Sequence, residues 1–245
     1  MSSKIGILET VNDKEYGDVD LFYSNYYEQV LRTGLIGAAQ DRTHRAMEKQ
    51  WKSEDRFETV LEVGSGKGEH FGFVRHSFAK YYETDLRTNN ETENSTFGLR
   101  SMDGGKGLIR ENADVMQLHY ADHEFDRLIA TCLVLHLEKP EKALSEMRRV
   151  TKSGGVISIL VPCEPGLLLR ISRRMLTSRK ARQAGFSGYD LFNARDHINY
   201  LSGIDKLIKH VFRSDKIVVS RKPFKFPSWN LNLYFVYTIH RGSGD

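Results

Sequence analysis

The 245-residue sequence has few cysteines, few prolines and no long apolar run. Its two cysteines, Cys132 and Cys163, are too few for a disulfide-stapled secreted scaffold, and in the cytoplasm both would stay reduced. No stretch approaches the roughly 18 uninterrupted apolar residues that a transmembrane helix needs. Residues 1–6 show no apolar signal core followed by a cleavage site, which argues against export. We therefore expect a cytoplasmic protein.

The composition is that of an ordinary globular protein, with 40% hydrophobic residues, 28% charged residues and five prolines. A chain of this length can form one large domain with a complete core. The formal net charge of +4 is too small to indicate nucleic-acid binding, and we expect no nucleic-acid partner. The positive charge is uneven, because residues 170–182 hold six Arg or Lys and no acid. The sequence leaves the oligomeric state open.

A short apolar run followed by three glycines organises the chain. Val60, Leu61 and Val63 suit a strand buried on both faces, and such strands are usually parallel. The glycines that follow form the exit loop, where a bare backbone can bend sharply and let a ligand approach its N–H groups. Beyond them, Phe71 and Phe78 mark an apolar helical spacing that predicts a helix against the sheet. Strand, glycine turn and helix are typical of the start of a nucleotide-binding unit.

The glycine spacing discriminates between nucleotide ligands. A dinucleotide fingerprint, G-x-G-x-x-G, would need a glycine where Glu69 stands, so NAD fits poorly. The Walker phosphate loop is excluded, because neither its spacing nor its hydroxyl residue is present. The pattern Glu-x-Gly-x-Gly-x-Gly instead resembles the first motif of the class I methyltransferases, which use S-adenosylmethionine. The resemblance implies that the wall under the methionine part of the cofactor is formed by Glu62, Gly64, Ser65, Gly66 and Gly68.

An acid ends the next predicted strand, residues 80–86. An acid at the end of the second strand of a βαβ unit faces a ribose bound over the first strand. Asp85 is therefore our predicted ribose-binding residue. NAD would use the same device, so Asp85 alone does not choose between the cofactors.

A second block of sequence resembles the ubiquinone/menaquinone-type branch of the same family. Asp114 and Asp126 have the branch's spacing of an acid and a later Phe-Asp pair. The resemblance implies that Asp114 accepts from the adenine amino group and that the Val115 N–H meets the ring. His119, Asp122 and His123 crowd together here, but a metal site needs three or four converging ligands, and we expect no metal.

Alternating strand and helix patterns predict an α/β, Rossmann-like fold with a mainly parallel seven-stranded sheet and helices on both faces. Residues 216–220 and 232–239 are expected to form a C-terminal antiparallel strand pair. The chain divides into residues 1–52, an N-terminal arm with lid helices that break near Gly34, and residues 53–245, the methyltransferase domain. The other predicted segments are strands at 126–132 and 156–162, helices from Pro140 to 150 and at 204–211, an irregular excursion at 87–107, and a variable substrate insertion at about 164–200.

Methyl transfer depends largely on holding the acceptor in line with the methyl group, and a base is needed only for a poorly nucleophilic acceptor. The candidate bases are His136, at the exit of the fourth predicted strand, and His197, in a region that borders the acceptor pocket in the resembled family. Tyr26, Tyr27 and Tyr200 are candidates for the substrate wall. No Asn/Asp-Pro-Pro-Tyr/Phe motif follows the fourth strand, which makes a nucleobase acceptor unlikely.

Helix-forming residues 166–182 pair an apolar face with arginines, which is typical either of a packed helix with solvated arginines or of a surface for anionic substrates or membrane headgroups. The predicted function is methyl transfer to an O or N atom of a small molecule, with an anionic or lipid-linked glycan intermediate as one acceptor class and peripheral membrane contact. Two alternatives stay open: a non-catalytic S-adenosylmethionine-binding module that serves a partner, and a nicotinamide-dependent oxidoreductase.

Overall fold

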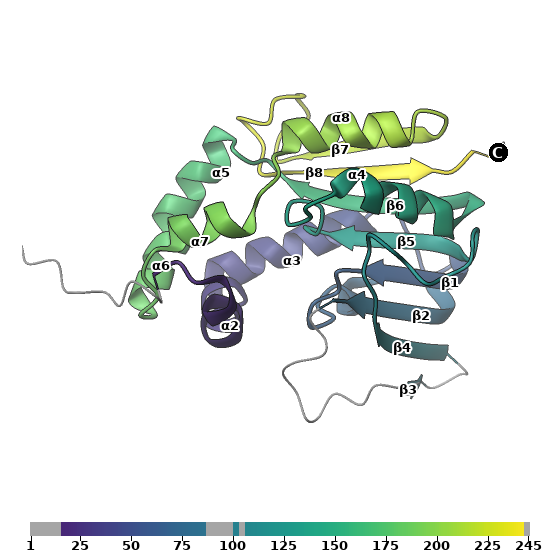
Figure 1. Cartoon of the computed structure of the whole chain (residues 1–245), viewed down its shortest axis with the longest axis horizontal. Helices are drawn as coiled ribbons and strands as arrows, with labels where there is room; N and C mark the ends of the chain where they lie inside the picture. The colour runs from purple at the N-terminus through teal and green to yellow at the C-terminus, as the bar shows by residue number, and fades with distance from the viewer. Residues whose placement is uncertain (1–15, 87–99, 103–105, 243–245) are drawn as a thin grey trace, which may run out of the picture.

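The computed structural model describes residues 16–86, 100–102 and 106–242, and its centre is one mixed β-sheet (Figure 1). The strands lie in the order β3-β4-β2-β1-β5-β6-β8-β7. Their bounds are β1 Arg56–Val63, β2 Ser77–Asp85, β3 Arg100–Met102, β4 Lys106–Asn112, β5 Phe125–Thr131, β6 Thr151–Pro162, β7 Lys216–Lys222 and β8 Tyr234–His240.

Five neighbouring strands, from β4 through β2, β1 and β5 to β6, run parallel, whereas β8 is antiparallel to both β6 and β7. The predicted Rossmann-like sheet with a C-terminal antiparallel pair is therefore confirmed, and the three-residue strand β3 adds an antiparallel edge beside β4. The parallel strands end at one edge of the sheet. The strand order reverses between β1 and β5, and this switch point is where open α/β sheets bind ligands.

Helices cover both faces of the sheet, as predicted (Figure 1). Helices α4 (Pro140–Val150) and α8 (Leu201–Val211) pack on one face, and α3 (Gly34–Glu48) packs on the other against β6 and β8. The remaining helical segments are α1 Val19–Leu21, the π-helical turn η1 Phe22–Tyr26, α2 Tyr27–Leu31, the 3₁₀ turn η2 Phe71–Phe73, α5 Leu167–Ser172, the π-helical turn η3 Arg173–Thr177, α6 Ser178–Gln183 and α7 Tyr189–Asp196. Among the described residues, no helix has both the length and the apolar character needed to cross a bilayer.

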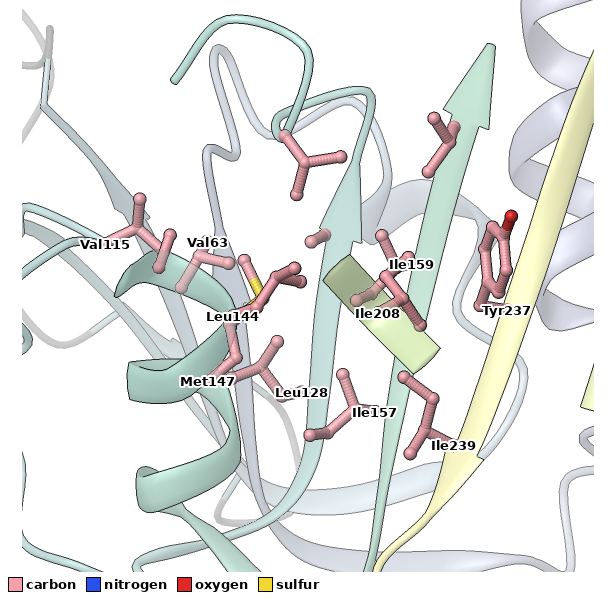
Figure 2. Packing of buried hydrophobic residues seen from close by; sticks show 14 of the residues in the cluster. Val63, Val115, Leu128, Leu144, Met147, Ile157, Ile159, Ile208, Tyr237 and Ile239 are labelled. Atoms are coloured by element: carbon pink, nitrogen blue, oxygen red, sulfur yellow. The ribbon is translucent and has the colours of Figure 1, made fainter. Parts of the chain in front are cut away.

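The main core lies between the sheet and helices α4 and α8 (Figure 2). Leu128 of β5, Ile157 of β6 and Ile239 of β8 share it with Leu144 of α4 and Ile208 of α8. Alternate residues of the same strands enter a second cluster on the opposite face, beside α3. Because successive strand residues point to opposite faces and both faces are covered, these strands read as continuous apolar runs.

A buried ion pair ties helix α3 to the sheet. Arg127 of β5 forms a bidentate contact with Glu48, and neither side chain is exposed. His70, which follows the glycine loop, contacts the same carboxylate with 3.1 Å between Nε2 and Oε1. Burial alone would raise the pKa of Glu48, but the His70 hydrogen bond and the Arg127 charge lower it to about 2. The carboxylate is therefore charged at neutral pH, and α3 is held against β5.

Two local predictions were wrong. The helix expected after the glycine loop is only the turn η2, and Phe78 belongs to strand β2, where it packs near Phe71 with ring centroids 6.0 Å apart. The apolar spacing thus reflects a turn and a strand that pack on each other. The predicted excursion at 87–107 includes β3 and the start of β4, while residues 87–99 and 103–105 lie outside the described residues.

The N-terminal helices break near Gly34 as predicted, because α2 ends at Leu31 and α3 begins at Gly34. Much of the predicted arm, residues 1–15, lies outside the described residues. Helices η1 and α2 pack against residues 181–192 in a third apolar cluster, which we call the lid. In the lid, Phe22 packs on Phe192 with ring centroids 4.2 Å apart. The division of the chain at residues 52 and 53 stays a prediction.

Candidate active site

The glycine loop leaves β1 at the switch point of the sheet. Gly64, Gly66 and Gly68 all have positive φ, at 65°, 56° and 81°. A Cβ on Gly64 would lie 2.7 Å from Leu133 Cδ1, and one on Gly68 would lie 2.7 Å from Glu83 Oε1. Both the backbone conformation and the space at these positions therefore require glycine.

Asp85 is oriented toward the glycine loop. It ends β2, and its Oδ2 accepts a hydrogen bond of 2.9 Å from the Gly66 N–H. Ser65, between the glycines, donates its N–H to the Thr84 carbonyl, which fixes the loop to the end of β2. The structure thus brings the predicted ribose-binding acid and the predicted loop together at one edge.

Glu62 lies below the loop rather than on its surface. Its side chain is buried, and Tyr81 donates a 2.7 Å hydrogen bond to its Oε2. Burial raises the pKa of Glu62 to about 8, although the Tyr81 hydrogen bond opposes the shift. In this position Glu62 supports the turn from underneath.

Asp114 and Val115 lie just beyond the end of β4, on the far side of β2 from the glycine loop. Asp114 Oδ1 accepts a hydrogen bond of 2.8 Å from the Met116 N–H, which closes a local turn. Val115 is buried in the main core and appears in Figure 2. Asp85 therefore ends β2, and Asp114 follows the neighbouring parallel strand β4, at one edge of the sheet.

The lid reaches the glycine loop through helix α2. Lys67 of the loop contacts Glu28 at 3.1 Å, and its Nζ lies 6.0 Å from the ring centroid of Tyr27. Burial, together with the charge of Glu69, raises the pKa of Tyr27, so its hydroxyl stays neutral. Tyr26 instead packs on Phe186 inside the lid, with ring centroids 5.2 Å apart. Of these two predicted wall residues, only Tyr27 borders the loop by these contacts.

The two candidate bases lie side by side although 61 positions separate them. His136 follows β5, and His197 follows helix α7; their ring centroids are 4.7 Å apart. His136 Nδ1 lies 2.9 Å from the carbonyl oxygen of Asp196, so this nitrogen must donate. His197 Nδ1 hydrogen-bonds Glu164, the acid that follows β6. Each imidazole is thereby held in one orientation by an acidic residue or its backbone.

The charges around the histidines are fixed by burial and pairing. Burial disfavours ionisation of Glu164, but hydrogen bonds from His197 and Arg173 lower its pKa to about 2. Burial likewise opposes ionisation of Asp196, but hydrogen bonds from His136 and Tyr23 lower its pKa. Burial lowers the pKa of His197 despite the Glu164 carboxylate, so this imidazole is neutral at pH 7.

A cavity of about 190 Å³ opens beside this cluster. Glu164 and His197 line it together with Arg170, Arg173 and Tyr200, the third predicted substrate residue. Tyr200 thus lines the same cavity as His197, whereas Tyr26 and Tyr27 belong to the lid.

Sequence reasoning missed the residues that orient the histidines: Tyr23, Glu164, Arg173 and Asp196. Asp196 could have been suspected because it directly precedes His197, and Glu164 because it directly follows a strand at the carboxyl edge. The sequence left open whether Arg173 is solvated or part of an anion-binding surface, and the structure shows that it turns inward to Glu164.

His136, Asp196 and His197 also offer possible metal-ligand atoms within 4.8 Å of one another. We interpret them as a hydrogen-bonded network, because Asp196 Oδ2 accepts from Tyr23 at 2.8 Å and Glu164 holds His197. At the segment considered from sequence, Asp122 pairs with Arg149 at 2.7 Å. The expectation of no metal stays a prediction.

Comparison with known proteins assigns the family. Residues 61–159 match the model described as a methyltransferase domain. A protein of Encephalitozoon cuniculi named as a methyltransferase is 39% identical over 154 residues, which cover 61% of this chain and 66% of that protein. The ubiquinone/menaquinone biosynthesis C-methyltransferase of Bdellovibrio bacteriovorus is 39% identical over 61 residues, 25% of this chain and 26% of that one. Residues 61–159 therefore form a methyltransferase domain of the class I S-adenosylmethionine-dependent type.

Solved structures of methyltransferases share the fold. An S-adenosylmethionine-dependent methyltransferase of Thermotoga maritima superposes with a TM-score of 0.58 at 15% identity, covering 91% of this chain and 99% of that one. Phosphoethanolamine N-methyltransferase 2 of Haemonchus contortus, solved with S-adenosylhomocysteine, gives 0.52 at 13% identity over 93% of this chain and 59% of that one. The alignments with the two curated relatives span less than two thirds of either relative's length.

The cofactor of this methyltransferase family is S-adenosylmethionine, and the loop fits it. Ser65 Oγ is buried and, within the described part of the chain, has no hydrogen-bond partner, so it can accept or donate to a ligand. Gly66, which lies next to Asp85, is exposed, so the backbone of Gly66 is accessible to a ligand. Glu69 stands where a dinucleotide fingerprint needs a third glycine, so the loop fits NAD poorly.

Proposed function

We propose that this methyltransferase transfers a methyl group to an oxygen or nitrogen atom of a small-molecule acceptor bound beside His136 and His197. The observation that carries the proposal is the pair of oriented histidines at the carboxyl edge of the sheet, on the β5 and β6 side of the glycine loop.

Cofactor binding is assigned to the loop and the acids at the ends of neighbouring strands. Bound S-adenosylmethionine supplies an electrophilic methyl group on a good leaving group. Ser65 and the Gly66 backbone would contact its methionine part, Asp85 its ribose hydroxyls, and Asp114 with the Val115 N–H its adenine. Glu62 would act by supporting the turn, because its carboxyl group is buried beneath it.

The two histidines have the tautomers that a base requires. Because each Nδ1–H donates to an oxygen, each Nε2 of a neutral ring carries a lone pair. A hydroxyl acceptor could transfer its proton to such a nitrogen, whereas an amine acceptor would need only positioning. Asp196 and Glu164 would stabilise the imidazolium that forms.

The acceptor cavity favours an anionic molecule. Arg170, Arg173 and the charged Glu164 line it; Arg173 is paired with Glu164, so exposed Arg170 is the guanidinium that would face an acceptor. Guanidinium groups bind phosphate and carboxylate oxygens well. A phosphate-bearing or lipid-linked glycan intermediate is our proposed acceptor class, and the cytoplasm, where Cys132 and Cys163 would stay reduced, is our proposed location.

The test combines cofactor binding with methyl transfer. Calorimetry of the full chain should detect S-adenosylmethionine and S-adenosylhomocysteine but not NAD. Candidate acceptors incubated with methyl-labelled S-adenosylmethionine are then screened by mass spectrometry. Cofactor binding without transfer to any acceptor would favour the non-catalytic module, and NAD binding of equal strength would favour the oxidoreductase.

Variants of the two histidines test the base. For a hydroxyl acceptor, His136→Asn or His197→Asn should lower kcat by roughly 10²–10⁴-fold while cofactor affinity is retained. The exposed His210→Asn, on helix α8, is the matched control and should keep parental kcat. Parental activity in both site variants would remove the histidines from the reaction.

A further inference from the structure

Helix α5 and its continuation through η3 expose apolar side chains. Leu167, Ile171 and Met175 recur every fourth residue and so lie on one helical face, and Met175 is 66% exposed. The opposite face is comparatively polar: Thr177 is buried, and Arg173 reaches Glu164. This helix therefore presents to solvent the face that a globular protein normally buries.

A second exposed apolar segment joins β7 to β8. Phe224, Phe226, Trp229 and Leu231 are all exposed, Phe226 by 62%. The segment is held in shape by the fully buried Asn232, whose Oδ1 accepts from the Phe224 N–H and whose amide donates to two backbone carbonyls. The aromatic rings are thus displayed by a fixed turn.

The two segments lie side by side, at the same end of the molecule (Figure 1). The N–H groups of Leu167 and Leu168 donate to Oδ1 and O of Asn230, at 3.2 and 2.9 Å. Gly166 packs so closely on the Trp229 carbonyl that a Cβ would overlap it. We name the result the docking surface, formed by Leu167, Ile171, Met175, Phe224, Phe226 and Trp229.

Positive charge surrounds the docking surface. Arg170, Arg174 and Lys225 are exposed beside it. No Asp or Glu occurs in residues 165–189 or 216–242, the two stretches that contain the surface. Clustered apolar side chains with basic neighbours and no acids are the pattern of a surface that enters the headgroup region of an anionic bilayer.

We propose that the docking surface binds the face of an anionic lipid bilayer. The charge argues against a second copy of the chain as the occupant, because a two-fold interface would bring these basic residues toward one another without acids between them. The acceptor cavity adjoins the surface, since Gly166 and Arg170 border both. The acceptor would then be a membrane amphiphile whose polar head enters the cavity beside His197. This identification of the acceptor rests on the proposed function.

Vesicle co-sedimentation of the full chain tests the proposal. Vesicles of phosphatidylcholine containing phosphatidylglycerol should bind the chain, and vesicles of phosphatidylcholine alone should bind it much more weakly. Arg170→Gln with Arg174→Gln should weaken binding roughly 30-fold, at about fivefold for each basic residue near the surface. Met175→Asp and Phe226→Asp should abolish binding at low and high salt, because they oppose insertion of apolar side chains.

Two controls keep the outcome clear. Leu35→Asp changes a residue on α3 that is 77% exposed, and it should bind vesicles like the parent. Calorimetric binding of S-adenosylmethionine should be unchanged in every variant, which separates failure of docking from failure of the proposed function. The proposal is overturned if the parent binds no anionic vesicle, or if Met175→Asp and Phe226→Asp abolish a self-association instead, which would assign the surface to a second copy.

Discussion

The strongest stability prediction concerns the buried contact between Glu48 and Arg127. Glu48→Gln keeps the shape of the side chain but removes the charge that faces a guanidinium with no exposure to solvent. Breaking a buried ion pair by removing one partner typically costs about 3–5 kcal/mol. Since a domain is stable by only about 5–15 kcal/mol, the variant should lose about a fifth of its stability or more.

Urea unfolding at pH 7 measures the effect. The midpoint should fall while the slope of free energy against urea stays constant, which identifies a change in stability rather than in compactness. Glu58→Gln is the matched control: its partner Arg56 is as exposed as Glu58 itself, and no measurable change is expected. Replacing both members, Glu48→Gln with Arg127→Met, should recover much of the loss, because no unpaired charge remains.

The pair of Glu48 and Arg127 also predicts that the free energy of unfolding falls at low pH. The folded pKa of Glu48, about 2, lies below its ordinary value of 4.5, so the carboxylate stabilises the fold fully above pH 4.5. This contribution disappears as the pH falls from 4.5 toward 2, and the gap between parent and Glu48→Gln should close over that range. A single variant as stable as its parent at pH 7, or a gap that is constant down to pH 2, would refute the reasoning.

Three further predictions address the loop and the buried histidines. Asp85→Asn should weaken S-adenosylmethionine binding at least tenfold by calorimetry, because charge-assisted hydrogen bonds contribute roughly 1.5–3 kcal/mol; unchanged affinity in a folded variant would contradict the ribose assignment. Gly64→Ala should lower both Tm and cofactor affinity, since φ is positive and Leu133 blocks a Cβ, whereas Gly72→Ala, with open space around it, should not. Burial lowers the pKa of His76 to about 4, so the neutral ring stabilises the fold fully above pH 6.5, and this stabilisation is lost as the pH falls toward 4. His76→Phe should therefore make the free energy of unfolding less dependent on pH over that range. An unaltered pH profile would contradict this role of His76.

The sheet was predictable from sequence where its strands are buried on both faces, but strand β4 was not. Its residues include Lys106, Arg110 and Glu111, and only Leu108 and Ile109 interrupt the polar run. Arg110 is accommodated by an ion pair with Glu83 of β2, so the strand is fixed by a partner from another element. Single-sequence periodicity contains no information about such a partner.

The candidate site was predictable in its parts but not in its connections. Motif spacing predicted the glycine loop and Asp85, and the family resemblance predicted both histidines; their roles stay predictions. It could not reveal that Glu164 holds His197 or that Arg173 turns inward, because those contacts depend on how residues 164–197 fold back over the sheet edge. Helical periodicity left open whether the arginines of residues 166–182 are solvated or bind an anion, and it could not show that Arg173 of η3 pairs with buried Glu164.

In the lid, residues near the start of the chain pack against residues 181–192. Phe22 packs on Phe192, and Lys180 donates to the Thr33 carbonyl at 2.7 Å, across 170 and 147 positions respectively. During synthesis, the N-terminal helices must therefore wait until nearly four fifths of the chain has left the ribosome before they find their partners. Until then their aromatic side chains lack the partners that bury them in the folded chain, so the N-terminal helices are expected to be among the last elements to reach their final packing.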